Sequence, residues 1–185
     1  KTVGLFSLMA QSGLHVPAQK AQFCMNNMVL CDIGDGQSIT ENLSTFSSHM
    51  KNIIEILGTA DDQSLVLLDE LGSGTDPAEG MGLAVSILEE MSKKGCLILA
   101  TTHYPEIKEF ARKSKEFINA RMAFDRTNLM PLYRLEIGEA GESCALYIAR
   151  KLGLPQAMIK RAHDVAYSEN DICKEDRYSL DELEA

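Results

Sequence analysis

The spacing of hydrophobic residues along the chain changes between two patterns, which predict buried strands and amphipathic helices. The run 65–68 is continuously apolar, as expected for a parallel strand buried on both faces, and 96–100 is predicted to be a second such strand. Between them, apolar residues recur at helical spacing from Met81 to Met91. They follow Asp76-Pro77, a pair that is typical of a helix start. The same spacing predicts an amphipathic helix over 46–57.

Weaker patterns complete the order of elements. They predict a helix at 3–10, a strand at 23–33, a helix at 105–112, a strand pair at 117–124 and 132–137, and helices at 142–152 and 156–167. Gly58 is expected to end the helix that precedes the first buried strand. The tail from residue 168 is polar and acidic and is expected to be frayed. Strands that alternate with helices predict an α/β fold with a largely parallel sheet and helices on both faces.

Composition and charge narrow the function classes. The 185 residues are 45% hydrophobic and 24% charged, which is ordinary for a soluble globular chain. The net charge of −9 argues against a nucleic-acid-binding surface in this chain, because such domains usually carry a basic excess. We expect no membrane helix, which needs about 20 apolar residues, and no secretory signal. Five cysteines without a CxxC pair favour a reducing cytoplasm over a structural zinc site.

Two acidic residues and a histidine follow the predicted buried strands. Active sites of open α/β sheets lie at the carboxyl ends of strands, where Asp69 and Glu70 follow the first of them. Asp69 is a candidate ligand of Mg²⁺, directly or through water, and Glu70 can orient or deprotonate an attacking water. His103, at the end of the second strand, could contact a γ-phosphate or the carboxylate that positions water. The alternatives are a polar loop start for the acids and a surface position for the histidine.

Two further segments have the composition of anion-binding sites. Residues 43–48 place hydroxyls at the start of an amphipathic helix, where free N–H groups attract anions, although plain N-capping is the alternative. The glycines of the segment 72–77 allow close approach of the backbone to a phosphate or a neighbouring segment. An ordinary strand-to-helix loop is the alternative for this segment.

In this order, the four features resemble the ATPase domain of the MutS family, a branch of the ABC-type ATPases. Ser44, Thr45 and Phe46 resemble the family signature, and residues 65–70 resemble Walker B. Residues 72–76 resemble the D-loop, with Gly74, Thr75 and Asp76, and His103 resembles the switch histidine. The resemblance covers about residues 1–167 and is strongest for the second bacterial MutS branch. That branch is linked to suppression of homologous recombination and to splitting of stalled ribosomes.

The resemblance implies a P-loop NTPase fold, an ABC-ATPase-like three-layer sandwich with a mostly parallel sheet and a C-terminal helix-turn-helix. It implies an ATPase domain over 1–139 that lacks its N-terminal strand and Walker A loop, a dimerising helix-turn-helix at 140–167, and a flexible acidic tail at 168–185. The pattern G-x-x-x-x-G-K-[ST] is absent, and Lys1-Thr2 is interpreted as lying just after that loop. These 185 residues alone are therefore expected to bind ATP very weakly and not to hydrolyse it.

The resemblance also implies how the intact protein works. A homodimer would bind and hydrolyse ATP with Mg²⁺, and would thereby open and close a clamp on branched or mismatched DNA or on a stalled ribosome. Asp69 would hold Mg²⁺, Glu70 would activate water, and His103 would stabilise the γ-phosphate or orient Glu70. Ser44 and Thr45 would reach the nucleotide of the partner copy. Domains outside this chain would bind the DNA or ribosome. The protein would act in the cytoplasm and would have no membrane partner.

Two other function classes remain open. The chain could be a non-enzymatic dimerisation module, with the helix pair at 142–167 as its active surface. It could also be an ordinary ABC transporter ATPase, although such signatures more often contain a Ser-Gly-Gly run than the Ser44-Thr45-Phe46 found here. Dimerisation that depends on nucleotide would separate an ATPase from a plain dimerisation module.

Overall fold

The computed structural model describes residues 1–34, 45–141 and 143–167. The chain divides into two compact units, residues 1–110 and 111–185. The first unit contains α1 (Thr2–Gln11), β1 (Met28–Asp32), α2 (Thr45–Thr59), β2 (Ser64–Leu68), α3 (Pro77–Lys93), β3 (Leu97–Ala100) and α4 (Pro105–Lys113), which extends past the division. Helices and strands therefore alternate throughout this unit, as the hydrophobic spacing predicts.

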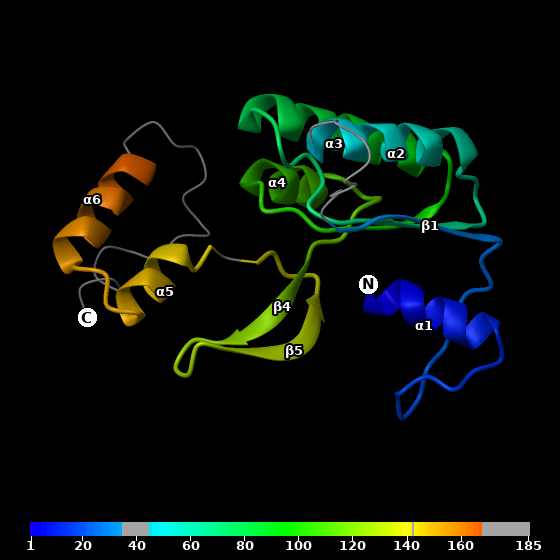
Figure 1. The fold of residues 1–185 in the computed structure, drawn as a ribbon, viewed down its shortest axis with the longest axis horizontal. Coiled ribbons are helices and arrows are strands. Elements are labelled where there is room, and N and C mark those ends of the chain that lie inside the picture. Colours follow the sequence, from blue (N-terminus) through cyan, green and yellow to red (C-terminus); the bar gives the residue numbers. More distant parts are fainter. Residues whose placement is uncertain (35–44, 142, 168–185) are drawn as a thin grey trace. The chain divides into compact units, whose positions relative to one another are not determined.

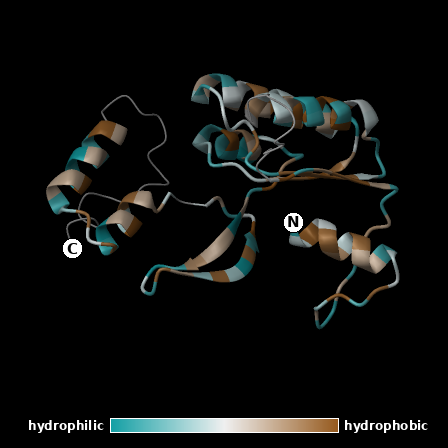
Figure 2. Cartoon of the chain, viewed as in Figure 1, coloured by the Kyte–Doolittle hydropathy of each residue, from teal (hydrophilic) through white to brown (hydrophobic). Residues whose placement is uncertain are grey.

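A parallel sheet forms the centre of the first unit. Its strands lie in the order β1-β2-β3, with Leu30 opposite Val66 and Val66 opposite Ile98 (Figure 1). All five residues of the central strand β2 are buried, as its continuous apolar run predicts. The hydropathy colours show the same concentration of apolar residues in the strands (Figure 2).

Helices cover both faces of this sheet. α2, α3 and α4 lie on one face and α1 lies on the other (Figure 1). α1 approaches β2 closely at Gly4, because a β-carbon there would lie 2.5 Å from Cδ1 of Leu67. The buried hydrophobic residues of the unit include Ile53, Ile56, Leu65, Val66, Leu67, Leu68, Ala84, Ile87, Leu88, Met91 and Ile107. Burial between layers of this kind is the main favourable term in folding.

Three sequence predictions about the first unit are wrong in detail. The predicted strand at 23–33 is shorter, since β1 spans only Met28–Asp32. β3 pairs with β2 alone among the described strands, and Leu97 is 51% exposed, so β3 is not buried on both faces. Gly58 lies inside α2 rather than ending it, because helical hydrogen bonds continue to the amide of Ala60, which donates to the carbonyl of Ile56.

The second unit contains a hairpin and a helix pair. β4 (Ala120–Asp125) and β5 (Met130–Ile137) are antiparallel, and α5 (Ala145–Lys151) and α6 (Gln156–Ala166) follow. Arg121 lies opposite Glu136, and its Nε donates a hydrogen bond to Oε2 of Glu136 at 2.8 Å. Hydrogen bonds from Arg134 and Arg121 lower the pKa of Glu136. The helix pair that the sequence predicts at 142–152 and 156–167 is present as α5 and α6, although α5 begins only at Ala145.

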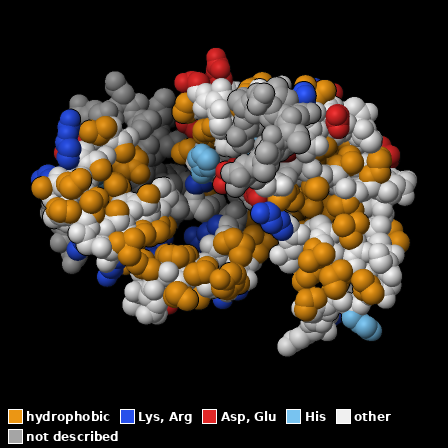
Figure 3. Space-filling model, viewed as in Figure 1, with side chains coloured by type: hydrophobic (Ala, Val, Ile, Leu, Met, Phe, Trp, Pro, Cys, Tyr) orange, Lys and Arg blue, Asp and Glu red, His pale blue; other side chains and the backbone are white. Residues whose placement is uncertain are grey.

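Hydrophobic side chains gather on the surface of the hairpin (Figure 3). Exposed members of this group are Met122, Met130, Leu132, Tyr133, Leu135 and Ile137. Exposed apolar groups of this extent often mark an interaction surface. Within the described ranges, no helix combines the length and the apolar composition that crossing a membrane requires.

Candidate active site

The two acids that follow β2 lie at the carboxyl edge of the sheet, beside the end of β3. Thr101, the first residue after β3, donates its hydroxyl to Oδ1 of Asp69 at 2.5 Å. The same hydroxyl accepts a hydrogen bond from the amide of Glu70 at 2.9 Å. The ends of parallel strands meet at one edge of a sheet, so a threonine 31 residues downstream of Glu70 becomes its direct neighbour.

The backbone of Glu70 is in the left-handed region, with φ of +51°. A residue with a β-carbon adopts this region rarely and at an energetic cost, so the surrounding contacts must hold it there. Thr101 supplies two of them, since its hydroxyl accepts from the amide of Glu70 and its carbonyl accepts from the amide of Leu71 at 2.9 Å. The Glu70 side chain is exposed at this turn.

Two glycines and a tyrosine hold the loop after β2 against the start of α3. Gly72 has φ of +85°, and a β-carbon there would lie 2.5 Å from the carbonyl oxygen of Gly80 in the first turns of α3. The hydroxyl of Tyr104 donates to the carbonyl of Gly72 at 3.0 Å. Asp76 caps α3 by accepting from the amides of Ala78 and Glu79, as the sequence predicts. The loop is therefore fixed at both ends.

The D-loop candidates lie beside the start of α2. A β-carbon on Gly74 would lie 3.5 Å from Cβ of Phe46, so the structure brings these two predicted residues together. Ser44 lies outside the described residues, and Thr45 is described only as the first residue of α2. Thr75 is partly buried in the same loop.

His103 is exposed beyond the end of β3. Its ring lies 5.1 Å from the ring of Tyr104, measured between centroids. Its side chain has no hydrogen-bond partner among the residues that the structure describes. The predicted contact of His103 with Glu70 or a phosphate therefore remains a prediction.

Sequence reasoning missed two groups at this edge. One is Thr101, which no sequence pattern distinguishes from its neighbours in the segment 100–103. The other is a cluster around Asp32, the last residue of β1, which bonds to His49 and Asn52 of α2. The i, i+3 spacing of the two α2 residues places them on one helix face, but their partner is 17 and 20 residues away.

The acids present fit a magnesium site only in part. Asp69 is partly exposed, and Thr101 bonds to only one of its oxygens, which leaves the other as a hard ligand. No group of three His, Cys, Asp or Glu side chains that could hold a metal occurs in the described part of the chain. Mg²⁺ commonly uses one or two carboxylates together with waters and phosphate oxygens, and Asp69 suits that arrangement.

Comparison with known proteins places the whole chain in one family. A family model described as MutS domain V matches residues 1–169. Endonuclease MutS2 of Pelotomaculum thermopropionicum is 51% identical over 185 residues, which are 100% of this chain and 24% of that protein. Endonuclease MutS2 of Clostridium botulinum is 54% identical over 171 residues, 92% of this chain and 22% of the relative. The protein of the same name from Bacillus cytotoxicus is 52% identical over 165 residues, with coverages of 89% and 21%. The chain thus spans about a quarter of the length of these relatives.

Proposed function

The chain belongs to the MutS family, whose domain V it matches over residues 1–169, and on that premise we propose that it forms the ATP-hydrolysing part of a larger protein. The observation that supports this most directly is the pair Asp69 and Glu70 at the end of the central buried strand, held by Thr101 of the neighbouring strand end. Acids placed at this edge suit phosphoryl transfer, in which positioning and electrostatic stabilisation supply most of the catalysis.

The proposed mechanism uses four described residues: Asp69, Glu70, Thr101 and His103. Asp69 would hold Mg²⁺, while Thr101 fixes the orientation of the carboxylate. Glu70 orients the attacking water and accepts its proton. His103 stabilises the γ-phosphate or orients Glu70. When bound there, Mg²⁺ would supply positive charge against the negative charge of the phosphate oxygens.

The proposal includes a second copy of the chain. Ser44, Thr45 and Phe46 of one copy contact the nucleotide of the other, and Gly74, Thr75 and Asp76 line the boundary between the two. The helix pair α5 and α6 adds to the dimer contact. Other parts of the whole protein would engage DNA or a ribosome in the cytoplasm, since the net charge of −9 does not suit this chain to nucleic acid.

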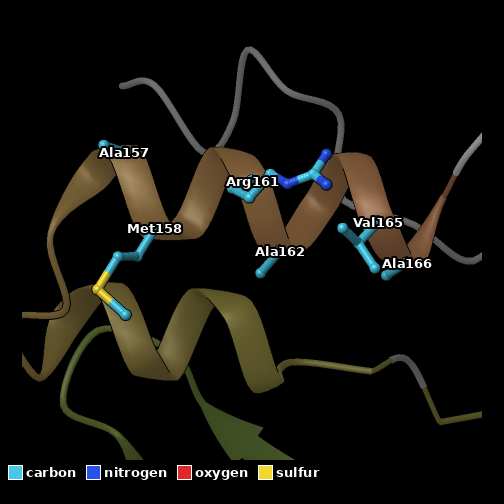
Figure 4. Close-up of a pocket in the computed structure, with 6 residues that line it drawn as sticks. All are labelled: Ala157, Met158, Arg161, Ala162, Val165 and Ala166. Atoms are coloured by element: carbon cyan, nitrogen blue, oxygen red, sulfur yellow. The ribbon is translucent and has the colours of Figure 1, made fainter.

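A non-enzymatic dimerisation module is the second candidate function. An open groove runs along α6, and five apolar residues line it together with Arg161 (Figure 4): Ala157, Met158, Ala162, Val165 and Ala166. Figure 4 shows Met158 reaching toward α5. A groove of this composition suits a helix from another copy, and such packing would need no nucleotide.

Nucleotide dependence of association separates the two functions. In the whole protein carrying Glu70→Gln, we expect Mg-ATP to strengthen self-association at least about tenfold, because each nucleotide is shared between two copies. Sedimentation velocity with Mg-ATP, with ADP and without nucleotide measures this. Equal association under all three conditions would favour the dimerisation module.

Thr101 tests the geometry of the site. Thr101→Val keeps the shape of the side chain but removes the hydroxyl shared by Asp69 and Glu70. We expect kcat for ATP hydrolysis to fall about tenfold, because the acids lose their fixed positions, and the affinity for nucleotide to change little. Thr101→Ser keeps the hydroxyl and should restore most of the rate. A Thr101→Val protein with wild-type turnover would contradict the positioning role.

A further inference from the structure

A buried carboxylate joins β1 to the face of α2. Asp32 is 6% exposed and accepts two side-chain hydrogen bonds from this helix. Its Oδ2 lies 2.8 Å from Nδ1 of His49, and its Oδ1 accepts from Nδ2 of Asn52 at 2.9 Å. Nδ2 of Asn52 also donates to the carbonyl of Cys31 at 3.1 Å. The end of β1 is thereby tied to α2 at two positions one helical turn apart.

Both contacts join a nitrogen of α2 to a carboxylate oxygen of Asp32. A carboxylate oxygen accepts hydrogen bonds, so the tautomer of His49 that pairs with Asp32 carries its proton on Nδ1. Removal of one donor would leave a buried polar oxygen without its partner, which costs more than the net value of an ordinary hydrogen bond. The cluster therefore favours one position of α2 relative to β1 over its alternatives.

The same residue also contacts the candidate active site. The carbonyl of Asp32 accepts a hydrogen bond from the amide of Asp69 at 2.9 Å. The backbone of Asp32 therefore supports the proposed magnesium ligand, while the side chain of Asp32 supports α2. His49 lies one turn after Thr45, the first residue of α2. Phe46, in that first turn, lies beside Gly74 of the D-loop candidate. Asp32 thus connects two parts of the proposed site. One is Asp69, which would act on the nucleotide of its own copy, and the other is the first turn of α2, which would contact the nucleotide of the partner copy.

We propose that Asp32, His49 and Asn52 form a positioning clamp, which sets the first turn of α2 so that it can contact the nucleotide held by a second copy. This inference rests on the proposed ATPase function and adds three positioning residues to it. A fault in the clamp would damage the site on the partner copy and leave the copy's own acids intact. That separation between copies distinguishes the clamp from a general contribution to folding.

Single substitutions in the whole protein give the first test. His49→Ala should lower kcat for ATP about 10- to 100-fold, with little change in the affinity for a fluorescent ADP analogue. His49→Asn places an N–H donor the same number of bonds from Cβ as Nδ1 and should restore most of the rate. Glu55→Ala, at an exposed position on the same helix, is the matched control and should leave the rate unchanged. A His49→Ala protein with wild-type kcat would overturn the proposal.

Mixed dimers give the sharper test. One copy carries His49→Ala and the other carries Glu70→Gln, and two different tags allow the mixed dimer to be purified. The copy with intact Glu70 then receives an intact α2 from its partner, so turnover should recover to about half of the wild-type rate. A mixed dimer as slow as the His49→Ala homodimer would place the defect within the copy's own site and overturn the proposal.

Amide hydrogen exchange tests the clamp without ATP. His49→Ala should speed exchange at residues 46–52 in the whole protein, and His49→Asn should speed it much less. Equal exchange in wild type and His49→Ala would overturn the clamp whatever the activity assays show. Wild-type turnover no faster than that of Glu70→Gln would instead remove the proposed function, and the exchange result would still decide whether the clamp exists.

Discussion

Replacement of Glu70 by glutamine is expected to lower ATP turnover by the whole protein at least ~10²-fold and to leave Mg-ATP bound. Glutamine keeps the size of the side chain but cannot accept a proton from the attacking water. The substitution also keeps the β-carbon, so the left-handed backbone at φ of +51° and its bond to Thr101 need not change. Phosphate release and the affinity for a fluorescent ATP analogue measure the two effects separately.

A matched control keeps this prediction specific. Glu89→Gln changes another exposed glutamate, on α3, and should leave turnover at the wild-type rate. If Glu70→Gln turned over ATP normally, Glu70 would not be the residue that activates water. If it lost both binding and turnover, Glu70 would have a structural rather than a catalytic role.

Gly80→Ala is expected to have the largest effect on the stability of the loop after β2. A β-carbon at Gly80 would collide with the carbonyl oxygen of Gly72 and would lie 2.9 Å from the hydroxyl of Tyr104. The backbone of the loop must then move away from α3, at a cost of about 1–3 kcal/mol, as for overpacked core positions. The displaced loop carries Gly74, so turnover should fall as well.

Gly82, in the same helix, is the control for this change. Nothing lies within 4 Å of a β-carbon built at Gly82, so Gly82→Ala should stabilise α3 by about 0.5–1 kcal/mol through helix propensity alone. Native-state amide hydrogen exchange over α3 measures both variants in the whole protein. Equal effects of the two substitutions would show that the close approach of Gly72 and Gly80 does not matter.

Local patterns predict those parts of the molecule that depend on one segment at a time. The continuous apolar run 65–68 predicts the buried central strand, because a strand covered on both faces has no polar side. Asp76-Pro77 predicts the start of α3, because a capping carboxylate and a fixed φ act within one turn. The location of Asp69 and Glu70 follows from the rule that parallel strands present their carboxyl ends at one edge.

Features that depend on distant segments are not visible in such patterns. Asp32 and His49 are 17 residues apart, and only the packing of α2 on the sheet brings them together. The exposed face of β3 could not be predicted, because an apolar run does not reveal whether a further element covers it. For His103 the sequence predicts a place near the site but gives no side-chain direction.

The most direct test of the magnesium-nucleotide site is the titration of a fluorescent ATP analogue into the whole protein, with Mg²⁺ and with EDTA. Wild type should bind at least about tenfold more tightly with Mg²⁺, because in the proposed site Asp69 would hold the ion that also binds the phosphates. Asp69→Asn, which still accepts the bond from Thr101, should lose most of that difference. Equal affinity of the wild type with Mg²⁺ and with EDTA, or a full magnesium effect in Asp69→Asn, would contradict the proposed site.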